Sequence, residues 1–444
     1  MAAQGQGATV AIIGAGPAGL FAARELANSG IKVVLFNRNI KPGGLAEYGI
    51  YPDKYRIKDG LREQFKKILI CENVTYFGNV SIGEKFPLKL DDLRTMGFAA
   101  ILVTCGAQGT KWLGLPGEEL GGIYHAKTLV YHYNHMPPFA TLPIKFGKRV
   151  IVVGVGNVMT DIVRFLVEKP EVEEITTIAR RGPAEVKFDK KELEHVAGYL
   201  DTEDFDCEVA RVSPAMKAVG QDPEAAISEI RETLAGVEKR ALKPVWRMHF
   251  LYSPQTMTGR DGRNVDTLVM EENILETRNG DIKAKGTGKF VETDTDMVVF
   301  AIGDKVDDEM GLPMQGSEFV KSDSPRFPVD GNSYELMDEK DPGRLEDVFV
   351  GGWSRNASTG MVGIARRDGA NAAKAIMAYL EQKSAADFVD MNSLEDELKK
   401  RGYRYVKVDA LEKLEQKEKE LAKAKGLPEF KFDTDDEMLA LMGL

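Results

Sequence analysis

The sequence predicts an α/β protein with two βαβ units, because one plan of elements occurs twice along the chain. In each unit an apolar strand enters a glycine-rich turn, and a helix and a second strand follow. The first unit covers residues 9–36, and the second covers residues 148–179, about 140 residues further on. Strands joined through a helix build a parallel sheet. A chain of 444 residues has room for two such domains.

The first unit begins with the apolar run TVAIIGAG, which we expect to be a strand that ends in glycines. The next segment, PAGLFAARELANSG, has helical spacing at Leu20, Ala23 and Leu26, and Gly30 should end that helix. IKVVLF then supplies the second strand.

The turn between this strand and helix has the pattern G-x-G-x-x-G, formed by Gly14, Ala15, Gly16, Pro17, Ala18 and Gly19. Its glycines allow a tight turn and a close approach of the backbone to a pyrophosphate, which the helix N-terminus then stabilises. Because the strand–turn–helix context is present, we expect a dinucleotide here rather than a purely structural turn. The acidic residue that usually binds ribose at the end of the second strand is replaced by Asn37.

The second unit reads KRVIVVGVG, NVMTDIVRFLVEK and ITTIA. Gly154 and Gly156 form its turn, and Asn157 stands where a helix cap is expected. Arg180 and Arg181 follow the second strand, at the position where an acidic residue would select a free ribose hydroxyl. Arginines there suit a 2′-phosphate through charge and bidentate geometry. The alternative is a pair of solvated loop residues.

The later segments are less regular. We expect hairpin-like stretches at WRMHFLYSP and VDTLVMEEN, and a buried strand at DMVVFAIGD. EDVFVGGW should be another strand, which precedes the helix DGANAAKAIMAYL. Beyond residue 384, DALEKLEQKEKELAKAKG predicts a charged helix with a stripe of Leu411, Leu414 and Leu421, exposed and lightly packed on the body.

Composition excludes several functional classes. The net charge of −10 argues against a nucleic-acid-binding protein, and no apolar run is long enough for a membrane span. The beginning of the chain has no features of a secretory signal. Three scattered cysteines suit a reducing cytoplasm and provide neither a C-x-x-C pair nor a set that could hold an iron–sulfur cluster. We predict no metal site, although His132 and His135 have i, i+3 spacing.

Taken together, these segments resemble the adrenodoxin-reductase-like ferredoxin–NADP reductases and, more distantly, the small subunit of glutamate synthase. The likeness lies in both glycine motifs, KPGGLAEYGIYPDKYRIK, ILVTCGAQGTKWLGLPGEELGGIYHAKTLVYHYNHMP, ARRGPAEVKFDKKELEHV, HFLYSPQTMTGRDGRNVDTL, VVFAIGD and GGWSRNASTGMVGIARRDGANAAKAI. It continues into the Gly-Leu-Pro-containing tail and therefore covers nearly the whole chain.

The resemblance implies two Rossmann-like domains, the second inserted in the first, and a C-terminal helical extension. We expect an FAD-binding domain at residues 1–107 and 328–383, an NAD(P)-binding domain at 108–327, and the extension at 384–444.

The resemblance also implies which residues contact each cofactor. For FAD these are Gly14, Gly16, Pro17, Ala18, Gly19, Asn37, Gly43, Gly44, Leu45, Gly106, Gly303, Trp353, Gly360, Met361, Val362 and Gly363. For NADP(H), or NAD(H) as the alternative, they are Gly154, Gly156, Asn157, Val158, Arg180 and Arg181. Glu192 matches a glutamate near the nicotinamide, and Trp353 belongs to a segment that covers the flavin and the nicotinamide. Lys54 takes the place of a histidine that belongs to a proton-handling network in close relatives. From these matches we place Glu192, Trp353 and Lys54 in catalytic roles.

The implied activity is electron transfer between NAD(P)H and a ferredoxin-like iron–sulfur protein or subunit. Because Glu194 replaces an arginine that relatives present to ferredoxin, the partner is expected to be a dedicated subunit of a larger oxidoreductase complex. The alternatives are a reductase of the pyridine nucleotide-disulfide type, which the lack of C-x-x-C disfavours, and a non-catalytic FAD-binding scaffold subunit, which the intact glycine motifs disfavour.

Overall fold

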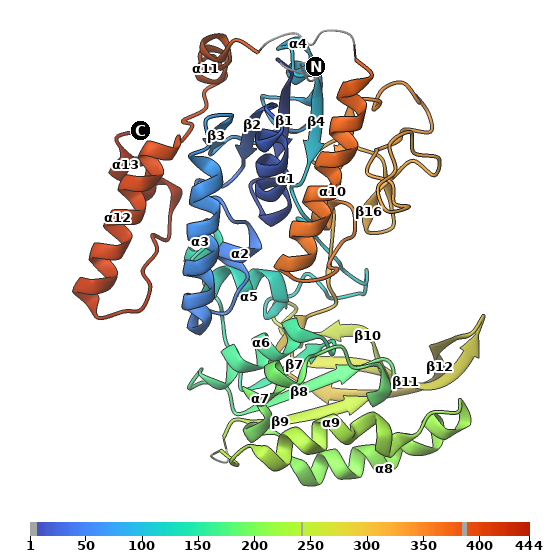
Figure 1. Ribbon diagram of the computed structural model, residues 1–444. Helices are drawn as coiled ribbons and strands as arrows, with labels where there is room; N and C mark the ends of the chain where they lie inside the picture. The colour runs from blue at the N-terminus through green and yellow to red at the C-terminus, as the bar shows by residue number, and fades with distance from the viewer. Residues whose placement is uncertain (1–6, 241–242, 384–388) are drawn as a thin grey trace. The chain divides into compact units, whose positions relative to one another are not determined.

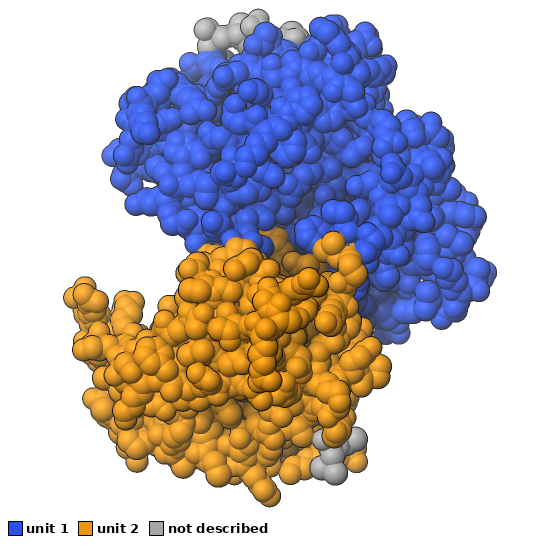
Figure 2. All heavy atoms as spheres, turned by 180° about the vertical axis from the view of Figure 1, so that it is seen from behind, with its two compact units in different colours: residues 1–110, 131–141, 303–444 blue, residues 111–130, 142–302 orange. Residues whose placement is uncertain are grey.

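The structure is a computed structural model that describes residues 7–240, 243–383 and 389–444. It contains two compact units, coloured separately in Figure 2. Unit 1 comprises residues 1–110, 131–141 and 303–444, and unit 2 comprises residues 111–130 and 142–302. Residues 303–327 lie in unit 1, whereas the boundary expected from the sequence groups them with the second domain. The division into cofactor-binding domains stays a prediction.

Unit 1 is built on a five-stranded parallel sheet with the order β17-β4-β1-β2-β3 (Figure 1). Its strands are β1 (Thr9–Ile13), β2 (Lys32–Asn37), β3 (Val74–Gly78), β4 (Ala100–Val103) and β17 (Val348–Val350). The central strand β1 is buried along its full length, which explains why its sequence is a continuous apolar run rather than an alternating one. The strand near residue 350 is also confirmed; it pairs with β4 in parallel.

The helices of unit 1 pack on this sheet. They are α1 (Pro17–Asn28), α2 (Leu45–Tyr48), α3 (Tyr55–Leu69), α4 (Leu90–Thr95) and α10 (Val362–Glu381), and α5 (Ala126–Tyr133) spans the division between the units. As predicted, Leu20, Ala23 and Leu26 of α1 are fully buried. In Figure 1, α1 and α10 lie side by side, and they pack closely against each other.

The C-terminal extension contributes α11 (Met391–Lys400), α12 (Val408–Lys425) and α13 (Asp435–Met442). The expectation that α12 is lightly packed is wrong. Leu411 and Leu414 are buried in the same apolar cluster as β1 and α1, together with Met438 of α13. The stripe continues at Glu418 and Ala422 rather than at Leu421, because a spacing of three to four residues follows the buried face more closely. The extension is therefore part of the core of unit 1.

Unit 2 contains a second parallel sheet with the order β6-β13-β7-β8-β9. Its strands are β6 (Ile123–His125), β7 (Arg149–Val153), β8 (Glu174–Ala179), β9 (Val245–Phe250) and β13 (Met297–Phe300). The predicted βαβ unit is present, since β7 and β8 pair in parallel and α6 (Asn157–Val167) joins them. The predicted buried strand is β13.

Three antiparallel strands complete unit 2: β10 (Tyr252–Thr258), β11 (Thr267–Arg278) and β12 (Asp281–Asp294). The hairpin-like prediction for WRMHFLYSP is wrong in its first part, because residues 245–250 form β9 and pair with β8 in parallel. Buried Trp246, Met248 and Phe250 alternate there with Arg247 and His249, as they would in a hairpin strand, so the local pattern did not separate the two cases. The helices are α7 (Lys190–Glu194), α8 (Thr202–Ala218) and α9 (Pro223–Gly236), and α8 lies beside α9 and β9 (Figure 1).

The remaining elements are short: β5 (Gly109–Thr110), β14 (Asp304–Lys305), β15 (Met314–Gln315), β16 (Glu318–Phe319), and the 3₁₀ turns η1 (Pro52–Lys54), η2 (Phe139–Thr141), η3 (Pro183–Glu185), η4 (Ala197–Tyr199) and η5 (Gly352–Ser354). None of the helices in the described part of the chain combines the length and apolar character that a membrane crossing needs.

Candidate functional site

The three glycines of the first turn have different structural roles. Gly14 has a φ of +109°, and a Cβ there would lie 2.5 Å from the main-chain oxygen of Thr104. A Cβ on Gly19 would lie 2.0 Å from the oxygen of Gly14, so this position must be glycine for α1 to meet the turn. Gly16 differs because a Cβ there would meet nothing within 4 Å. The backbone at Gly16 therefore faces open space at the start of α1.

The N-terminus of α1 is left without a side-chain cap. Gly16 is its N-cap, no side chain accepts a hydrogen bond there, and Pro17 occupies the first helical position. Ala18 follows as a buried small residue. An uncapped helix N-terminus beside open space is the arrangement that binds a pyrophosphate.

The loop that contains Gly43 and Gly44 lies directly against this turn. The main-chain N–H of Gly43 donates a 2.7 Å hydrogen bond to the oxygen of Ala15. Gly44 has a φ of +52°, and a Cβ there would lie 3.2 Å from the Cα of Gly16. Leu45 begins α2 immediately afterwards. Both glycine segments thus border one space.

Asn37 ends β2 and is buried, with all its polar atoms engaged. Its Oδ1 accepts a hydrogen bond from the N–H of Ala15, and its Nδ2 donates to the main-chain oxygens of Asn39 and Lys41. The expected contact of Asn37 with a ribose stays a prediction. What the geometry shows is a side chain that joins the glycine turn to the loop before Gly43.

The segment from Gly352 to Gly363 lies in unit 1 and contains several of the residues predicted to contact FAD. The indole N–H of Trp353 donates to the main-chain oxygens of Thr359 and Gly360, which closes a tight loop. Gly360 has a φ of +78°, Met361 is exposed, and α10 starts at Val362 with no side-chain cap. Gly363, in the first turn of α10, is exposed as well.

This segment is anchored to α1 by close backbone contacts. A Cβ on Gly352 would lie 2.6 Å from the Cβ of Ala18, and a Cβ on Gly369 would lie 2.1 Å from the oxygen of Ala18. The N-terminal part of α10 is therefore brought beside the first glycine turn, within unit 1.

A buried ion pair that the sequence did not reveal holds the same segment. Asp368 of α10 accepts a hydrogen bond from the N–H of Gly352 at 2.6 Å and pairs with the guanidinium of Arg355 at 2.6 Å. Arg355 also lies over the ring of Tyr334, whose hydroxyl donates to Asp368. Burial alone would lower the pKa of the Arg355 guanidinium, but the hydrogen bonds and charge of Asp368 outweigh it and raise the pKa above its usual value. No local pattern marks this pair, because the partners lie in a loop and in a helix.

Three further predicted positions also lie in unit 1. Gly106 has a φ of +75°, and its N–H donates to the hydroxyl of Ser354 at 2.8 Å, which ties it to the Trp353 segment. Gly303 has a φ of +86° and follows the end of β13. Lys54 ends η1, just before α3, and is half-buried. The catalytic role expected for Lys54 stays a prediction.

The glycine turn of unit 2 repeats the plan of unit 1. Gly154 has a φ of +128°, and a Cβ there would lie 2.3 Å from the oxygen of Ala301. A Cβ on Gly156 would meet nothing within 4 Å. The expectation that Asn157 caps α6 is wrong, since Gly156 is the N-cap. Val158, in the first turn, is exposed. This helix N-terminus is also without a side-chain cap.

The amide of Asn157 instead connects α6 to α7. It donates to the carboxylate of Asp189 at 2.8 Å and accepts from the N–H of Asp189 at 2.7 Å. Asp189 is the N-cap of α7, so the half-buried Glu192 lies one turn from this connection. This link between the glycine turn and Glu192 was not predicted, because Asn157 and Asp189 are 32 residues apart in the sequence.

Arg180 and Arg181 follow the end of β8, at the same sheet edge as the Gly154 turn. The two strands are in register there, with Val153 beside Ile178. Arg180 is exposed, and no hydrogen bond or ion pair of its side chain occurs with the described residues. Arg181 donates to the main-chain oxygen of Ile282 at 3.4 Å. The pair is therefore placed where a nucleotide phosphate could reach it, and Arg180 has its guanidinium available.

The histidines and cysteines give no sign of a metal site in the described residues. His132 contacts the main-chain oxygen of Phe139, and His135 pairs with Asp433. Within the described ranges, no group of three His, Cys, Asp or Glu side chains is arranged to hold a metal ion. Burial raises the pKa of the Cys105 thiol to about 11.

Comparison with known proteins agrees with this architecture. Residues 8–221 match the sequence family described as pyridine nucleotide-disulphide oxidoreductase. The chain is 27% identical to the mitochondrial NADPH:adrenodoxin oxidoreductase of Arabidopsis thaliana, over 97% of this chain and 94% of that protein. It is 28% identical to the NADPH-ferredoxin reductase FprA of Mycobacterium leprae, over 86% and 87% of the two chains.

Among solved structures, FprA of Mycobacterium tuberculosis in complex with NADPH has a TM-score of 0.81 to this structure. The identity is 24%, and the match covers 99% of this chain and 100% of that chain. At this identity the likeness concerns the fold. The predicted fold, with two dinucleotide-binding α/β domains and a helical C-terminus, is confirmed.

Proposed function

We propose that this chain is an adrenodoxin-reductase-like oxidoreductase, which transfers electrons between NADPH and a ferredoxin-like iron–sulfur protein and has FAD as its resident cofactor. The observation that carries the proposal is the repeated phosphate cradle. Gly16 and Gly156 each face open space at an uncapped helix N-terminus, one in each unit. Two dinucleotide sites in one chain suit a flavin and a nicotinamide.

FAD fits unit 1 because two glycine segments and two helix N-termini surround the same region. Gly14, Gly16 and Gly19 would hold its pyrophosphate, with Pro17 and Ala18 in the first turn of α1. Gly43, Gly44 and Leu45 would border the flavin side, and Gly360 to Gly363 would present the N-terminus of α10. Bound FAD supplies the chemistry that accepts two electrons together and releases them singly.

NADPH is assigned to unit 2. Gly154, Gly156, Asn157 and Val158 would contact its pyrophosphate, and Arg180 and Arg181 would bind the 2′-phosphate. An arginine fork distinguishes a phosphate from a hydroxyl by charge and geometry, so NADPH is preferred and NADH is the alternative. Glu192 would lie near the nicotinamide, and Lys54 would hold or move a proton.

An iron–sulfur cluster is typically held by four cysteine thiolates, and the chain has only three cysteines. The one-electron partner must therefore be another protein. Cys71, Cys105 and Cys207 are free thiols, and a dithiol mechanism of the disulfide reductase type would need a pair. The acidic Glu194 is exposed, which favours a dedicated partner subunit over a strongly acidic ferredoxin. We propose the cytoplasm as the location, because free thiols persist in reducing compartments.

The partner assignment is tested with purified protein reconstituted with FAD. NADPH should reduce a low-potential ferredoxin under anaerobic conditions, and cytochrome c reduction should depend on added ferredoxin. If the protein holds FAD and oxidises NADPH but no ferredoxin or co-purifying iron–sulfur subunit accepts electrons, the assignment is wrong.

A further inference from the structure

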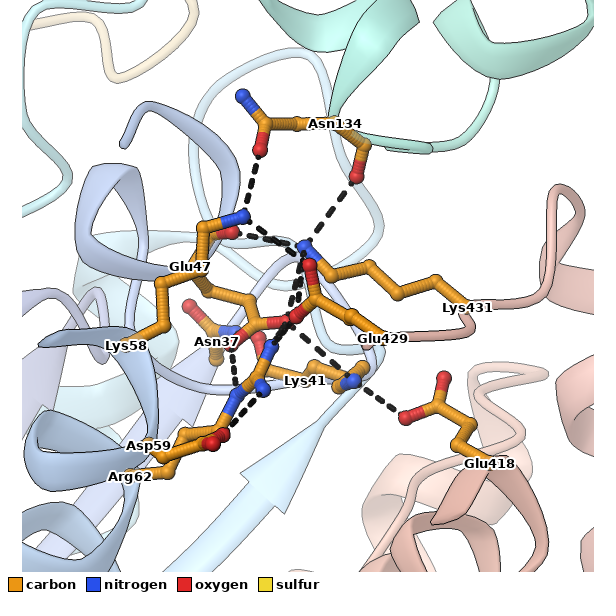
Figure 3. Close-up of polar contacts among 10 residues, drawn as sticks. All are labelled: Asn37, Lys41, Glu47, Lys58, Asp59, Arg62, Asn134, Glu418, Glu429 and Lys431. Atoms are coloured by element: carbon orange, nitrogen blue, oxygen red, sulfur yellow. Dashed lines mark hydrogen bonds and ion pairs between the residues drawn. The ribbon is translucent and has the colours of Figure 1, made fainter. Parts of the chain in front are cut away.

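A cluster of charged side chains lies where residues 427–433, which join α12 to α13 and are called the C-terminal segment below, meet α2 and α3 of unit 1 (Figure 3). We call it the charge cluster, and its members are Lys41, Glu47, Lys58, Arg62, Glu418, Glu429 and Lys431. Five of them are buried: Lys41, Glu47, Lys58, Glu418 and Lys431. Charges are rarely buried unless each one is paired, so their placement is closely determined by their partners.

Glu47 of α2 is the centre of the cluster. Arg62 donates to both of its carboxylate oxygens, at 2.7 and 2.6 Å. Lys41 and Lys431 lie 3.3 and 3.1 Å from Oε1. Burial alone would raise the pKa of the Glu47 carboxyl, but these cations hold it well below its usual range. The carboxylate is therefore charged and shared among three elements.

Lys431 brings the C-terminal segment into this centre. Gly426 caps α12 in the left-handed conformation, and the C-terminal segment begins directly after it. The Lys431 ammonium then donates to the main-chain oxygens of Glu47 and Asn134, at 2.8 and 3.3 Å. It also lies 4.9 Å from the ring centroid of Tyr48. The contact to a main-chain atom of α2 fixes the position of the backbone itself.

Glu429 provides the opposite charge from the same segment. Its carboxylate pairs with Lys58 at 3.2 Å and closely with Arg62. Lys58 also donates to the amide oxygen of Asn134 at 2.9 Å. Without Glu429, the fully buried ammonium of Lys58 would lose a carboxylate partner. The segment thus contributes one cation and one anion to a network that also contains Glu418 of α12 and four residues from the N-terminal part of unit 1.

The cluster lies two contacts from the first glycine turn. Lys41 and Glu47 flank the loop of Gly43 and Gly44. The main-chain oxygen of Lys41 accepts a hydrogen bond from Asn37, which in turn accepts one from the N–H of Ala15. At the other end of the loop, Gly43 donates to the oxygen of Ala15. Any displacement of Glu47 or Lys41 therefore changes the loop that borders the open space at Gly16.

We propose that Lys431 and Glu429 are positioning residues for the cofactor site of unit 1. They hold residues 42–48, the Gly43–Gly44 loop and α2, against the glycine turn, so that FAD binds tightly only while the C-terminal segment is docked. The inference rests on the proposed FAD site. Coupling between two sites is reciprocal, so FAD must in turn stabilise the docked segment.

The variant test measures FAD affinity of the apoprotein. Lys431→Met keeps most of the side-chain volume and removes the donor, and Glu429→Gln removes only a charge. Both should raise the Kd for FAD by about 5- to 150-fold. Lys423→Met is the matched control, because Lys423 is exposed on α12. Its Kd should equal that of the unchanged protein.

Hydrogen exchange of the unchanged protein provides the second test and requires no variant. FAD should slow amide exchange in residues 42–48 and also in residues 429–433, whereas α11 should exchange as before. Tight FAD binding without protection of residues 429–433, or folded variants with an unchanged Kd, would overturn the inference. If the unchanged protein bound no FAD at all, the proposed function would fail, and the inference with it.

Discussion

The side-chain oxygen of Asn37 accepts a hydrogen bond from the main-chain N–H of Ala15 at 3.1 Å. The amide group of Asn37 donates to the oxygens of Asn39 and Lys41 on its other side. A carboxylate at this position could accept from Ala15 but could not donate to the two carbonyls. The replacement of the usual acidic residue at the end of β2 is thus explained by the loop that follows it.

Asn37→Asp is therefore expected to destabilise unit 1 by about 1–3 kcal/mol at neutral pH, because buried acceptors lose their donor. Asn39→Asp introduces the same charge at a half-buried position nearby and should have a smaller effect. Urea denaturation of the two variants and the parent measures the difference. Equal stability of the Asn37 variant and the parent would show that the bonds of Asn37 are dispensable.

Arg180→Ala should raise the KM for NADPH by about tenfold to a hundredfold, since a hydrogen bond to a charged group contributes about 1.5–3 kcal/mol. The KM for NADH should hardly change, because NADH has no 2′-phosphate. Arg278→Ala removes an exposed arginine from β11 of the same unit and serves as the control. A similar rise for both nucleotides would assign Arg180 to a part of the cofactor that they share.

Arg355→Met should destabilise the protein by about 3–5 kcal/mol, because the buried carboxylate of Asp368 would lose its charged partner. Arg367→Met removes an exposed charge one residue from Asp368 and should have little effect. Thermal melts of apoprotein give the comparison. A small loss for Arg355→Met would mean that water replaces the guanidinium and that the pair does not fix the Trp353 segment.

Acid should weaken the docking of the C-terminal segment. The cations of the charge cluster lower the pKa of both Glu47 and Glu429, although burial opposes this shift. A lowered folded-state pKa gives stabilisation that is complete above the unfolded value, about 4.3 for glutamate, and is lost as the pH falls below it.

The free energy of unfolding should therefore fall as the pH is lowered from 5 to 3. Glu429→Gln should reduce that dependence, whereas Glu420→Gln, which alters an exposed carboxylate of α12, should keep it. Urea titrations at several pH values test this. An identical pH profile for parent and Glu429→Gln would contradict the account of Glu429.

The cysteines should differ in reactivity. Because burial raises the pKa of Cys105 to about 11, little of its thiolate is present at pH 8. Cys207 is exposed on α8. Mass spectrometry after a short treatment with iodoacetamide should find Cys207 alkylated and Cys105 unmodified in the native protein, and both alkylated after denaturation. Rapid native labelling of Cys105 would show that its surroundings open readily.

The sequence predicted what depends on local pattern. Both βαβ units, the glycine turns and the strand ends at Asn37 and Arg180 follow from apolar periodicity and glycine spacing, and the structure contains them. The role of Asn157 was not predictable, because its partner Asp189 lies 32 residues away. The strand β9 has the same composition as a hairpin strand, and only the neighbouring β8 decides its direction.

The charge cluster was invisible for a related reason. Lys431 and Glu47 are 384 residues apart, and each looks like a surface residue in its own segment. The leucine stripe of α12 was interpreted as light packing of an exposed helix, and it gave no sign that Glu418 is buried. Long-range pairing of charges, together with the apolar packing of Leu411, Leu414 and Met438, joins the extension to the rest of unit 1.

The central claim is that a flavin in this chain accepts electrons from NADPH. The direct measurement mixes the FAD-loaded protein with NADPH or NADH anaerobically and follows the visible flavin absorbance in a stopped-flow instrument. We predict that NADPH bleaches the flavin at about 1–10³ s⁻¹, typical of enzyme turnover, and that NADH does so more slowly. A protein that holds FAD but is bleached by neither nucleotide would contradict the account.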